Sequence, residues 1–361
     1  MDISDGYQFE SFDYNNNYTY YYTEDYGGNF TPHEEPVVQH KSTCFSEVLC
    51  VTLLLVTAVI FLLGSVGNAL VIWIAGFRMK KTINTTWYLS LAISDFIFCA
   101  CLPFSITHMA MDNWIFGLFM CKFTSFVMFV NMFSSIFLLV IISVDRCVSV
   151  MFPVWAQNHR SVKKASVVVF LAWVFAVALS LPSIIFRDVA THMGKTSCYN
   201  NYNSDRHIHK IIGVVRFLAG FVIPFLIIII CYSIIILKIK TNRMTKISKP
   251  FKVMTALVAA FFTCWLPYHV FVLLELNHQN YDHNVITIGL KVGTSVAAAN
   301  SFLNPVLYVF MGNDFRQKFK SSVMSKMESA MGAEGAEGRT TSLSRYLSRS
   351  SSVDGRASTH I

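Results

Sequence analysis

Long runs of apolar residues alternate with short polar connections along most of the chain. Seven runs are long enough to cross the roughly 30 Å hydrocarbon core of a bilayer as helices, and none alternates apolar and polar residues like a barrel strand. Because backbone groups in lipid must bond internally, the pattern predicts an all-α membrane protein, a bundle of seven transmembrane helices. The expected spans cover approximately residues 48–74, 84–106, 118–150, 162–185, 208–238, 252–275 and 285–310.

The residues outside these runs predict two tails and a surface helix. Residues 1–46 are acidic and rich in tyrosine, and they lack apolar periodicity, so we expect a disordered tail before a bundle over residues 47–312. In residues 313–327 the apolar positions recur at i, i+4 and i+8 with bases opposite, which predicts a short amphipathic helix on the membrane surface. Residues 328–361, rich in Gly, Ser and Arg, are expected to form a second disordered tail.

Basic residues near the ends of the runs predict the orientation of the bundle. Lys and Arg gather after the first, third, fifth and seventh runs, whereas the first 47 residues hold one Lys against nine acids. Since cytoplasmic connections carry the excess of Lys and Arg, we expect the N-terminus outside the cell and the C-terminus in the cytoplasm. Asn17 and Asn29, each in an Asn-x-Thr sequence, then become glycosylation sites, whereas Asn84 lies at a cytoplasmic end and is expected to be unmodified.

Composition supports a membrane protein over a soluble one. The 361 residues are 54% hydrophobic and 14% charged, whereas a soluble domain carries about 25% charged residues. The net charge of +8 is not gathered on a soluble face, so nucleic-acid binding is not expected.

Polar and kinking residues inside the apolar runs carry the functional signal, because such groups are costly in lipid. One feature of this kind is common in membrane helices, whereas a full ordered set, with members in every run, is specific. The set, in chain order, is Gly67-Asn68, Asp95, Asp145-Arg146-Cys147, Trp173, Pro224 with Tyr232, Cys264-Trp265-Leu266-Pro267 and Asn304-Pro305-Val306-Leu307-Tyr308.

With this set, residues 46–326 resemble the rhodopsin-like G-protein-coupled receptors. Cys147 departs from the family, which usually has Tyr after Asp-Arg. Within the family the chain is most similar to the chemoattractant peptide receptors of the chemerin-receptor group, with formyl-peptide and complement-anaphylatoxin receptors as neighbours. The stretches that carry the narrower resemblance are 109–112, 154–162, 186–188, 249–252 and 264–269.

The resemblance implies a function and a set of partners. We expect a plasma-membrane receptor for a peptide or small protein chemoattractant, chemerin-like first of all, that activates a heterotrimeric G protein of the inhibitory class. Receptor kinases and arrestin are the further partners implied. A formyl-peptide or complement-anaphylatoxin type of receptor is the alternative, as is a decoy that scavenges ligand with weak G-protein coupling.

Other function classes leave no trace in the sequence. A transporter would show repeated halves or charges in rows across the bilayer, and neither is present. No His-Glu-x-x-His or Gly-x-Ser-x-Gly motif and no carboxylate pair at matching depth supports a membrane enzyme. The intact Asp145-Arg146 and Asn304–Tyr308 motifs favour coupling over a decoy, which stays open as an alternative.

The outer mouth of the bundle is the expected ligand pocket. Arg216 lies two turns outward of Pro224, and its match in related peptide receptors makes it a candidate anchor for a ligand carboxylate or carbonyl. Lys291 adds a second cation, and Glu275 is a candidate receiver of a basic group. The alternatives are an internal salt bridge for Arg216 and solvated rim charges for Lys291 and Glu275.

The resemblance also implies a disulfide between Cys121 and Cys198, both expected on the oxidising side. Cys44 has no cysteine in the last outer connection to pair with, so the second disulfide of chemokine receptors is not expected. No cysteine follows Cys264, which excludes palmitoylation of the surface helix. The remaining cysteines are expected to be small packing residues: Cys50, Cys99, Cys101, Cys147, Cys231 and Cys264.

A sodium ion that favours the inactive state is implied at Asp95, the deepest acid. Hard oxygens around a carboxylate suit a small hard cation. A protonated, hydrogen-bonded Asp95 without an ion is the alternative. Apart from this ion no cofactor is expected. The implied ligands are Asp95, Asn131, Ser135 and Asn300.

The same resemblance implies a conformational switch. The prolines each remove a helical hydrogen bond and allow a hinge, although they can also merely shape the bundle. Arg146 is expected to be held by Asp145 at rest and freed on activation to meet a cytoplasmic partner, rather than forming a solvated pair. The switch and coupling residues are Asp145, Arg146, Tyr232, Trp265, Pro267, Asn304, Pro305 and Tyr308.

Serines among arginines in the C-terminal tail predict a shut-off element. Phosphates would turn the weakly basic tail acidic, so that it can dock on a cationic partner such as arrestin. Incidental serines in a plain disordered tail are the alternative. The expected phosphorylation sites are Ser342, Ser344, Ser348, Ser350, Ser351 and Ser352.

Overall fold

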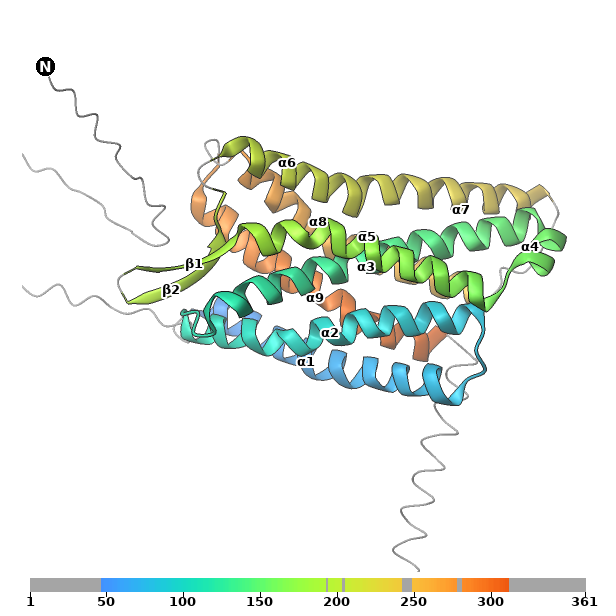
Figure 1. The fold of residues 1–361 in the computed structure, drawn as a ribbon, viewed down its shortest axis with the longest axis horizontal. Coiled ribbons are helices and arrows are strands. Elements are labelled where there is room, and N and C mark those ends of the chain that lie inside the picture. The colour runs from blue at the N-terminus through green and yellow to red at the C-terminus, as the bar shows by residue number, and fades with distance from the viewer. Residues whose placement is uncertain (1–46, 193, 203–204, 242–248, 278–280, 312–361) are drawn as a thin grey trace, which may run out of the picture. The chain divides into compact units, whose positions relative to one another are not determined.

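The structure, a computed structural model, describes residues 47–192, 194–202, 205–241, 249–277 and 281–311 (Figure 1). Several expectations fall outside these residues and stay predictions: both tails, the surface helix over 313–327, the glycosylation sites Asn17 and Asn29, and the tail serines.

The described chain is almost entirely helical (Figure 1). Two π-helical turns, η2 (Ile74–Arg78) and η3 (Leu218–Val222), extend α1 and join α6 to α7. The helices are α1 (Val48–Trp73), α2 (Ile83–Met111), α3 (Gly117–Met151), α4 (Pro153–His159), α5 (Val162–Phe186), α6 (Arg206–Phe217), α7 (Ile223–Thr241), α8 (Lys249–Glu275) and α9 (His283–Met311).

Seven helical segments are long and apolar enough to cross a membrane, as the sequence predicts. Their ends fall within a few residues of the expected ones, because lipid sets a minimum length for each apolar run. The segments are Val48–Arg78, Ile83–Met111, Gly117–Met151, Val162–Phe186, Arg206–Thr241, Phe251–Glu275 and Asn284–Tyr308.

The helix α3 is the central element of the bundle. Of its most apolar stretch, 72% of the residues are buried inside the protein, against 22% for α1 and α5. Phe133, Ile136 and Leu138 of α3 are fully buried and belong to one apolar core with Phe261 and Trp265 of α8. The outer helices turn large apolar side chains away from the bundle, which is the pattern expected of lipid-facing surfaces.

A β-hairpin is an element that the sequence pattern does not predict. Strands β1 (Arg187–His192) and β2 (Lys195–Asn200) pair antiparallel, with Val189 opposite Cys198. Gly194, in the turn, has a φ of +77°, a conformation that favours glycine. The hairpin lies at one end of the bundle and α4 at the other (Figure 1). We call these the hairpin end and the α4 end.

Proline and glycine shape the helices next to the sites. Pro224 has no N–H and its ring crowds the carbonyl of Gly220, four residues earlier. The helix widens there into the π-turn η3, which begins two residues after Arg216. At Gly293 the backbones of α9 and α8 approach so closely that a Cβ would lie 2.9 Å from backbone atoms of Tyr268. This approach fixes α9 against the Trp265–Pro267 segment of α8.

Candidate functional site

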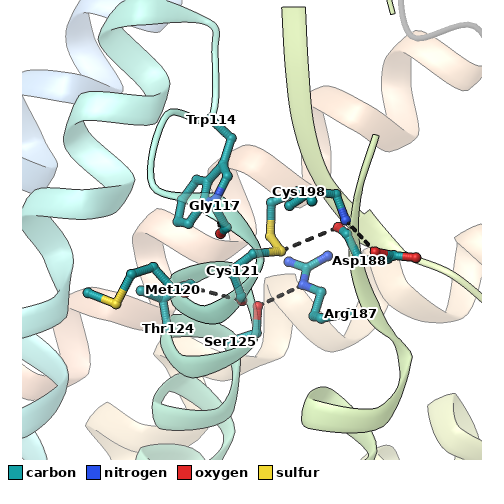
Figure 2. The surroundings of a disulfide bond; sticks show 10 residues. Trp114, Gly117, Met120, Cys121, Thr124, Ser125, Arg187, Asp188 and Cys198 are labelled. Carbon is teal, nitrogen blue, oxygen red and sulfur yellow. Dashed lines mark hydrogen bonds between the residues drawn. A yellow bond between two sulfur atoms is a disulfide. The ribbon is translucent and has the colours of Figure 1, made fainter. Parts of the chain in front are cut away.

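The hairpin is fastened to the start of α3 (Figure 2). The structure contains the expected disulfide between Cys121 and Cys198, with their Cα atoms 5.7 Å apart. Arg187 Nε donates a 2.7 Å hydrogen bond to Ser125 Oγ, one turn further along α3. On the other strand the Thr196 backbone N–H donates to Asn113 Oδ1 at 2.7 Å. These contacts attach the hairpin to α3 and to the segment that precedes it.

One cysteine expectation is wrong. Cys50 takes part in a disulfide rather than acting as a packing residue. Its partner is not among the described residues, where Cys121 and Cys198 bond each other and five other cysteines are free thiols. The physical reason is position: Cys50 lies half-buried in the first turn of α1, at the hairpin end, and not in the apolar interior.

Arg216 is a buried cation without an acidic partner among the described residues. Its exposed fraction is 8%, and none of the ion pairs in the described part of the chain includes it. One nitrogen donates to Ser183 Oγ at 2.9 Å, and the guanidinium carbon lies 3.7 Å from the centroid of the Phe129 ring. Its Nε atom has no partner among the described residues. A neutral hydroxyl and an aromatic face supply no formal negative charge to balance the guanidinium.

A second guanidinium, Arg187, lies in the same electrostatic neighbourhood. Burial lowers the pKa of Arg187, and the positive charge of Arg216 lowers it further. Burial also raises the pKa of the Tyr202 phenol, an effect that the charges of Arg216 and Arg187 oppose and that of Glu275 reinforces. Glu275 therefore lies with the two arginines. Lys291 is exposed, and its charge acts on His108 of α2, as does that of Arg187.

Asp95, in the middle of α2, is fully buried among amides and hydroxyls. Asn131 Nδ2 donates to Asp95 Oδ1 at 2.9 Å, and Asn304 Nδ2 donates to Asp95 Oδ2 at 2.7 Å. Ser301 Oγ donates to Asn131 Oδ1 at 3.4 Å. One carboxylate thus joins α2, α3 and α9.

Two of the expected sodium ligands lack partners in the described structure. Ser135 Oγ and both polar atoms of the Asn300 side chain are buried without a hydrogen bond to any described residue. Unpaired buried polar atoms are rare and point to an absent ion or water. Ser135 Oγ, Asn300 Oδ1 and the Asp95 carboxylate are oxygen donors, which are the ligands that suit a small hard cation.

The switch residues of α8 and α9 are buried at the core. The Trp265 side chain is 1% exposed and packs edge-on against Tyr268, with ring centroids 5.8 Å apart. Tyr308 is also 1% exposed, and its ring centroid lies 4.7 Å from that of Tyr88 on α2. Pro267 and Pro305 lie within their helices, one beside each of these aromatic residues. The Tyr308–Tyr88 contact links the Pro305 site to α2, whereas the Trp265–Tyr268 contact lies within α8.

At the α4 end, Asp145 contacts two arginines. Arg146 Nη2 lies 3.2 Å from Asp145 Oδ2, so the expected pair is present. Arg160, which follows α4, binds the same carboxylate with two nitrogens, at 2.8 Å to Oδ1 and 2.7 Å to Oδ2. Arg146 also donates to Asn84 Oδ1. An open cavity of about 210 Å³ lies beside these groups, lined by Thr82, Ile83, Asn84, Arg146 and Arg160.

Comparison with known proteins settles the family. Residues 67–308 match the family model of the 7 transmembrane receptor (rhodopsin family). Chemerin-like receptor 1 of Homo sapiens is 44% identical over 326 residues, which cover 85% of this chain and 87% of that protein. Formyl peptide receptor 2 of Mus musculus is 40% identical over 326 residues, covering 85% and 93% respectively. The chain belongs to the rhodopsin family of seven-transmembrane receptors.

Membership of the family defines the general activity of the receptor. It is a multi-pass plasma-membrane protein that binds an extracellular ligand and couples to a G protein, and it is not an enzyme. The resemblance to the chemoattractant peptide group is confirmed by the chemerin-like and formyl peptide receptors among its relatives. The identity of its ligand and the class of its G protein stay predictions.

Arg187 and Arg160 were not identified as site residues from the sequence. Arg187 stands next to Asp188 and so looks like half of a local charge pair. Asp188 instead accepts hydrogen bonds from Asn201 Nδ2 and from the backbone N–H of Val189, which lower the pKa of its carboxyl. Arg160 looks like one of several loop bases. In both cases the sequence offered one indication, a basic residue next to the end of an apolar run.

Proposed function

We propose that this receptor binds a peptide or small protein chemoattractant, chemerin-like first of all, through a ligand carboxylate at the hairpin end. It then activates a heterotrimeric G protein of the inhibitory class at the α4 end. The hairpin end is extracellular and the α4 end cytoplasmic in this proposal. The excess of Lys and Arg in the connections at the α4 end and the disulfide at the hairpin end support that orientation.

The uncompensated charge of Arg216 carries the proposal. An arginine that is only 8% exposed has lost most of its water, and the Ser183 hydroxyl, the Phe129 ring and the Tyr202 phenol beside it are neutral groups. A carboxylate matches the planar guanidinium geometrically and supplies the missing negative charge. The C-terminal carboxylate of a peptide suits such a site, because no further residue follows it and it can enter a pocket end-on.

Arg187 makes the anchor a pair. The positive charges of Arg216 and Arg187 repel each other. A ligand carboxylate near both would attract both guanidiniums and offset this repulsion. Glu275 lies in the same neighbourhood, which suits a ligand that carries a basic group next to its terminal carboxylate. The relatives named for chemerin and for formyl peptides support a peptide ligand.

An allosteric sodium ion is part of the proposal. Asp95, Asn131, Ser135 and Asn300 would hold it, with the ion supplying positive charge that keeps the three helices joined in the inactive state. The buried and unpartnered oxygens of Ser135 and Asn300 support this assignment. Shut-off by receptor kinases and arrestin is proposed for the tail serines, which lie outside the described residues.

The test is a signalling assay in cells that lack related receptors. Recombinant chemerin, a formyl peptide and a complement anaphylatoxin peptide are applied in turn, and cAMP and G-protein activation are measured together with surface binding. We expect chemerin to bind and to lower cAMP. Binding without any G-protein response would instead identify a decoy receptor, and a response only to formyl or anaphylatoxin peptides would reassign the ligand.

A further inference from the structure

We propose that Arg160 is a positioning residue for the switch arginine, Arg146. By occupying both oxygens of Asp145, it weakens the hold of that carboxylate on Arg146, and it leaves Asn84 as the main resting contact of Arg146. The inference rests on the proposed coupling to a G protein at the α4 end.

The geometry at Asp145 favours Arg160 over Arg146. Arg160 makes a fork of two short bonds, 2.8 and 2.7 Å, whereas Arg146 reaches a single oxygen at 3.2 Å. The difference has a simple origin: adjacent residues on a helix point in different directions, so Arg146 reaches Asp145 only from the side. A guanidinium from another element can approach the carboxylate head-on, and the forked arrangement is the strong one.

The backbone around Arg160 holds this fork in place. Arg160 is the capping residue of α4, and its N–H donates to the carbonyl of Ala156 at 3.1 Å. The next residue, Ser161, caps the start of α5 through a bond from the Lys164 N–H to its side chain. Arg160 thus lies between two capped helices, so its guanidinium is delivered to Asp145 by a defined backbone and not by a long loop.

The resting contact of Arg146 comes from the α2 side. Asn84 is the second residue of α2, and the helix start is fixed by a capping box between Thr82 and Thr85. The Asn84 side-chain oxygen accepts from Arg146, and the cavity of about 210 Å³ beside them gives Arg146 room to leave. An amide contact without charge is weaker than a salt bridge, so Arg146 is held but readily released.

Opposite effects follow for the two partners. Replacing Arg160 frees both oxygens of Asp145 to take Arg146, so the Arg160→Gln variant should lower basal and agonist-driven nucleotide exchange. Replacing Asn84 removes the resting contact, so Asn84→Ala should raise basal exchange. The side chains of Asp145, Arg146 and Arg160 are 15%, 18% and 26% exposed, so solvent screens the pairs and we expect changes of about 2- to 5-fold.

The experiment uses the full-length receptor in nanodiscs with purified inhibitory heterotrimer, with and without recombinant chemerin. Lys163→Gln is the matched control, since it removes one exposed positive charge from the same connection. Arg160→Lys keeps the charge without the fork and should lie between wild type and Arg160→Gln. In an Asp145→Asn background, Arg160→Gln should have no further effect on exchange. Binding of labelled chemerin should stay within twofold of wild type.

A loss of stability alone would move Arg160→Gln and Asn84→Ala in the same direction, and that result overturns the inference. So does an effect of Arg160→Gln that persists in the Asp145→Asn background. Thermal unfolding of the single and double variants gives a readout without ligand or G protein. If the coupling free energy between Asp145 and Arg160 is no larger than that between Asp145 and Lys163, the inference is also overturned. A wild-type receptor that shows this coupling but never catalyses exchange refutes the proposed function, and the positioning role falls with it.

Discussion

Removing the Arg216 guanidinium should weaken ligand binding by a large factor without unfolding the receptor. In the free receptor Arg216 contacts the Ser183 hydroxyl at 2.9 Å and the Phe129 ring at 3.7 Å, with no described carboxylate partner. The Arg216→Met variant keeps an apolar stem over Phe129, and Glu275 keeps the opposite charge of Arg187. We therefore expect normal surface expression.

The size of the effect follows from the bond that is lost. A hydrogen bond to a charged group contributes roughly 1.5–3 kcal/mol, which corresponds to about a 10- to 150-fold change in dissociation constant. At 8% exposure, solvent screens the charge little, which favours the upper half of that range. Arg216→Lys should fall in between, because a lysine keeps the charge but cannot form the fork or stack as well.

The assay compares two forms of one ligand on each variant. A peptide with the C-terminal sequence of chemerin is prepared as the free acid and as the amide, and its affinity is measured for wild type, Arg216→Met and the control Lys291→Ala. Amidation should weaken binding to wild type and to Lys291→Ala far more than to Arg216→Met. Equal losses on amidation in all three receptors would show that Arg216 does not recognise the carboxylate.

Three further outcomes are expected. Arg146→Ala should bind labelled chemerin normally but lose catalysis of nucleotide exchange; wild-type exchange in reconstituted membranes would contradict this. Asp95→Asn removes the acid from the described cluster on α2, α3 and α9, so agonist affinity should lose its dependence on sodium concentration, and a retained sodium shift would place the ion elsewhere. The tail serines are Ser342, Ser344, Ser348, Ser350, Ser351 and Ser352. Replacing them together by alanine should slow the loss of surface receptor after agonist is added. Unchanged internalisation and unchanged arrestin recruitment would show that these serines are not the shut-off element.

The spans were predictable from sequence because lipid imposes one strong rule on each of them. An apolar run must be long enough and must satisfy its own backbone, so composition along the chain is sufficient to locate it. The partners of Asp95 were partly predictable for a related reason, since few polar groups exist at that depth. Asn131 was expected beside Asp95 as a sodium ligand, whereas Asn304 was assigned to the switch and lies 2.7 Å from the carboxylate.

The connections between spans follow no comparable rule. The segment from Arg187 to Asn200 shows no strong alternation, and its hairpin depends on the bond to Cys121 and on contacts with Asn113 and Ser125. Arg160 meets Asp145 because the helix α4, which lies between the two residues in the chain, reverses the direction of the backbone. Such pairings are set by tertiary geometry, which periodicity within a single segment does not encode.

The helix α5 has an arginine within two residues of each end. Ser161 separates Arg160 from its first residue, and Phe186 leads straight into Arg187. Its 25 residues measure about 37 Å at 1.5 Å per residue, somewhat more than a hydrocarbon core of about 30 Å. Because most of α5 faces lipid, membrane thickness bears on it directly, and a thinner bilayer must tilt this helix rather than shorten it. Tilting would displace Arg160 and Arg187 together, so the thickness of the bilayer, set by its lipids, would change the positions of both arginines at once.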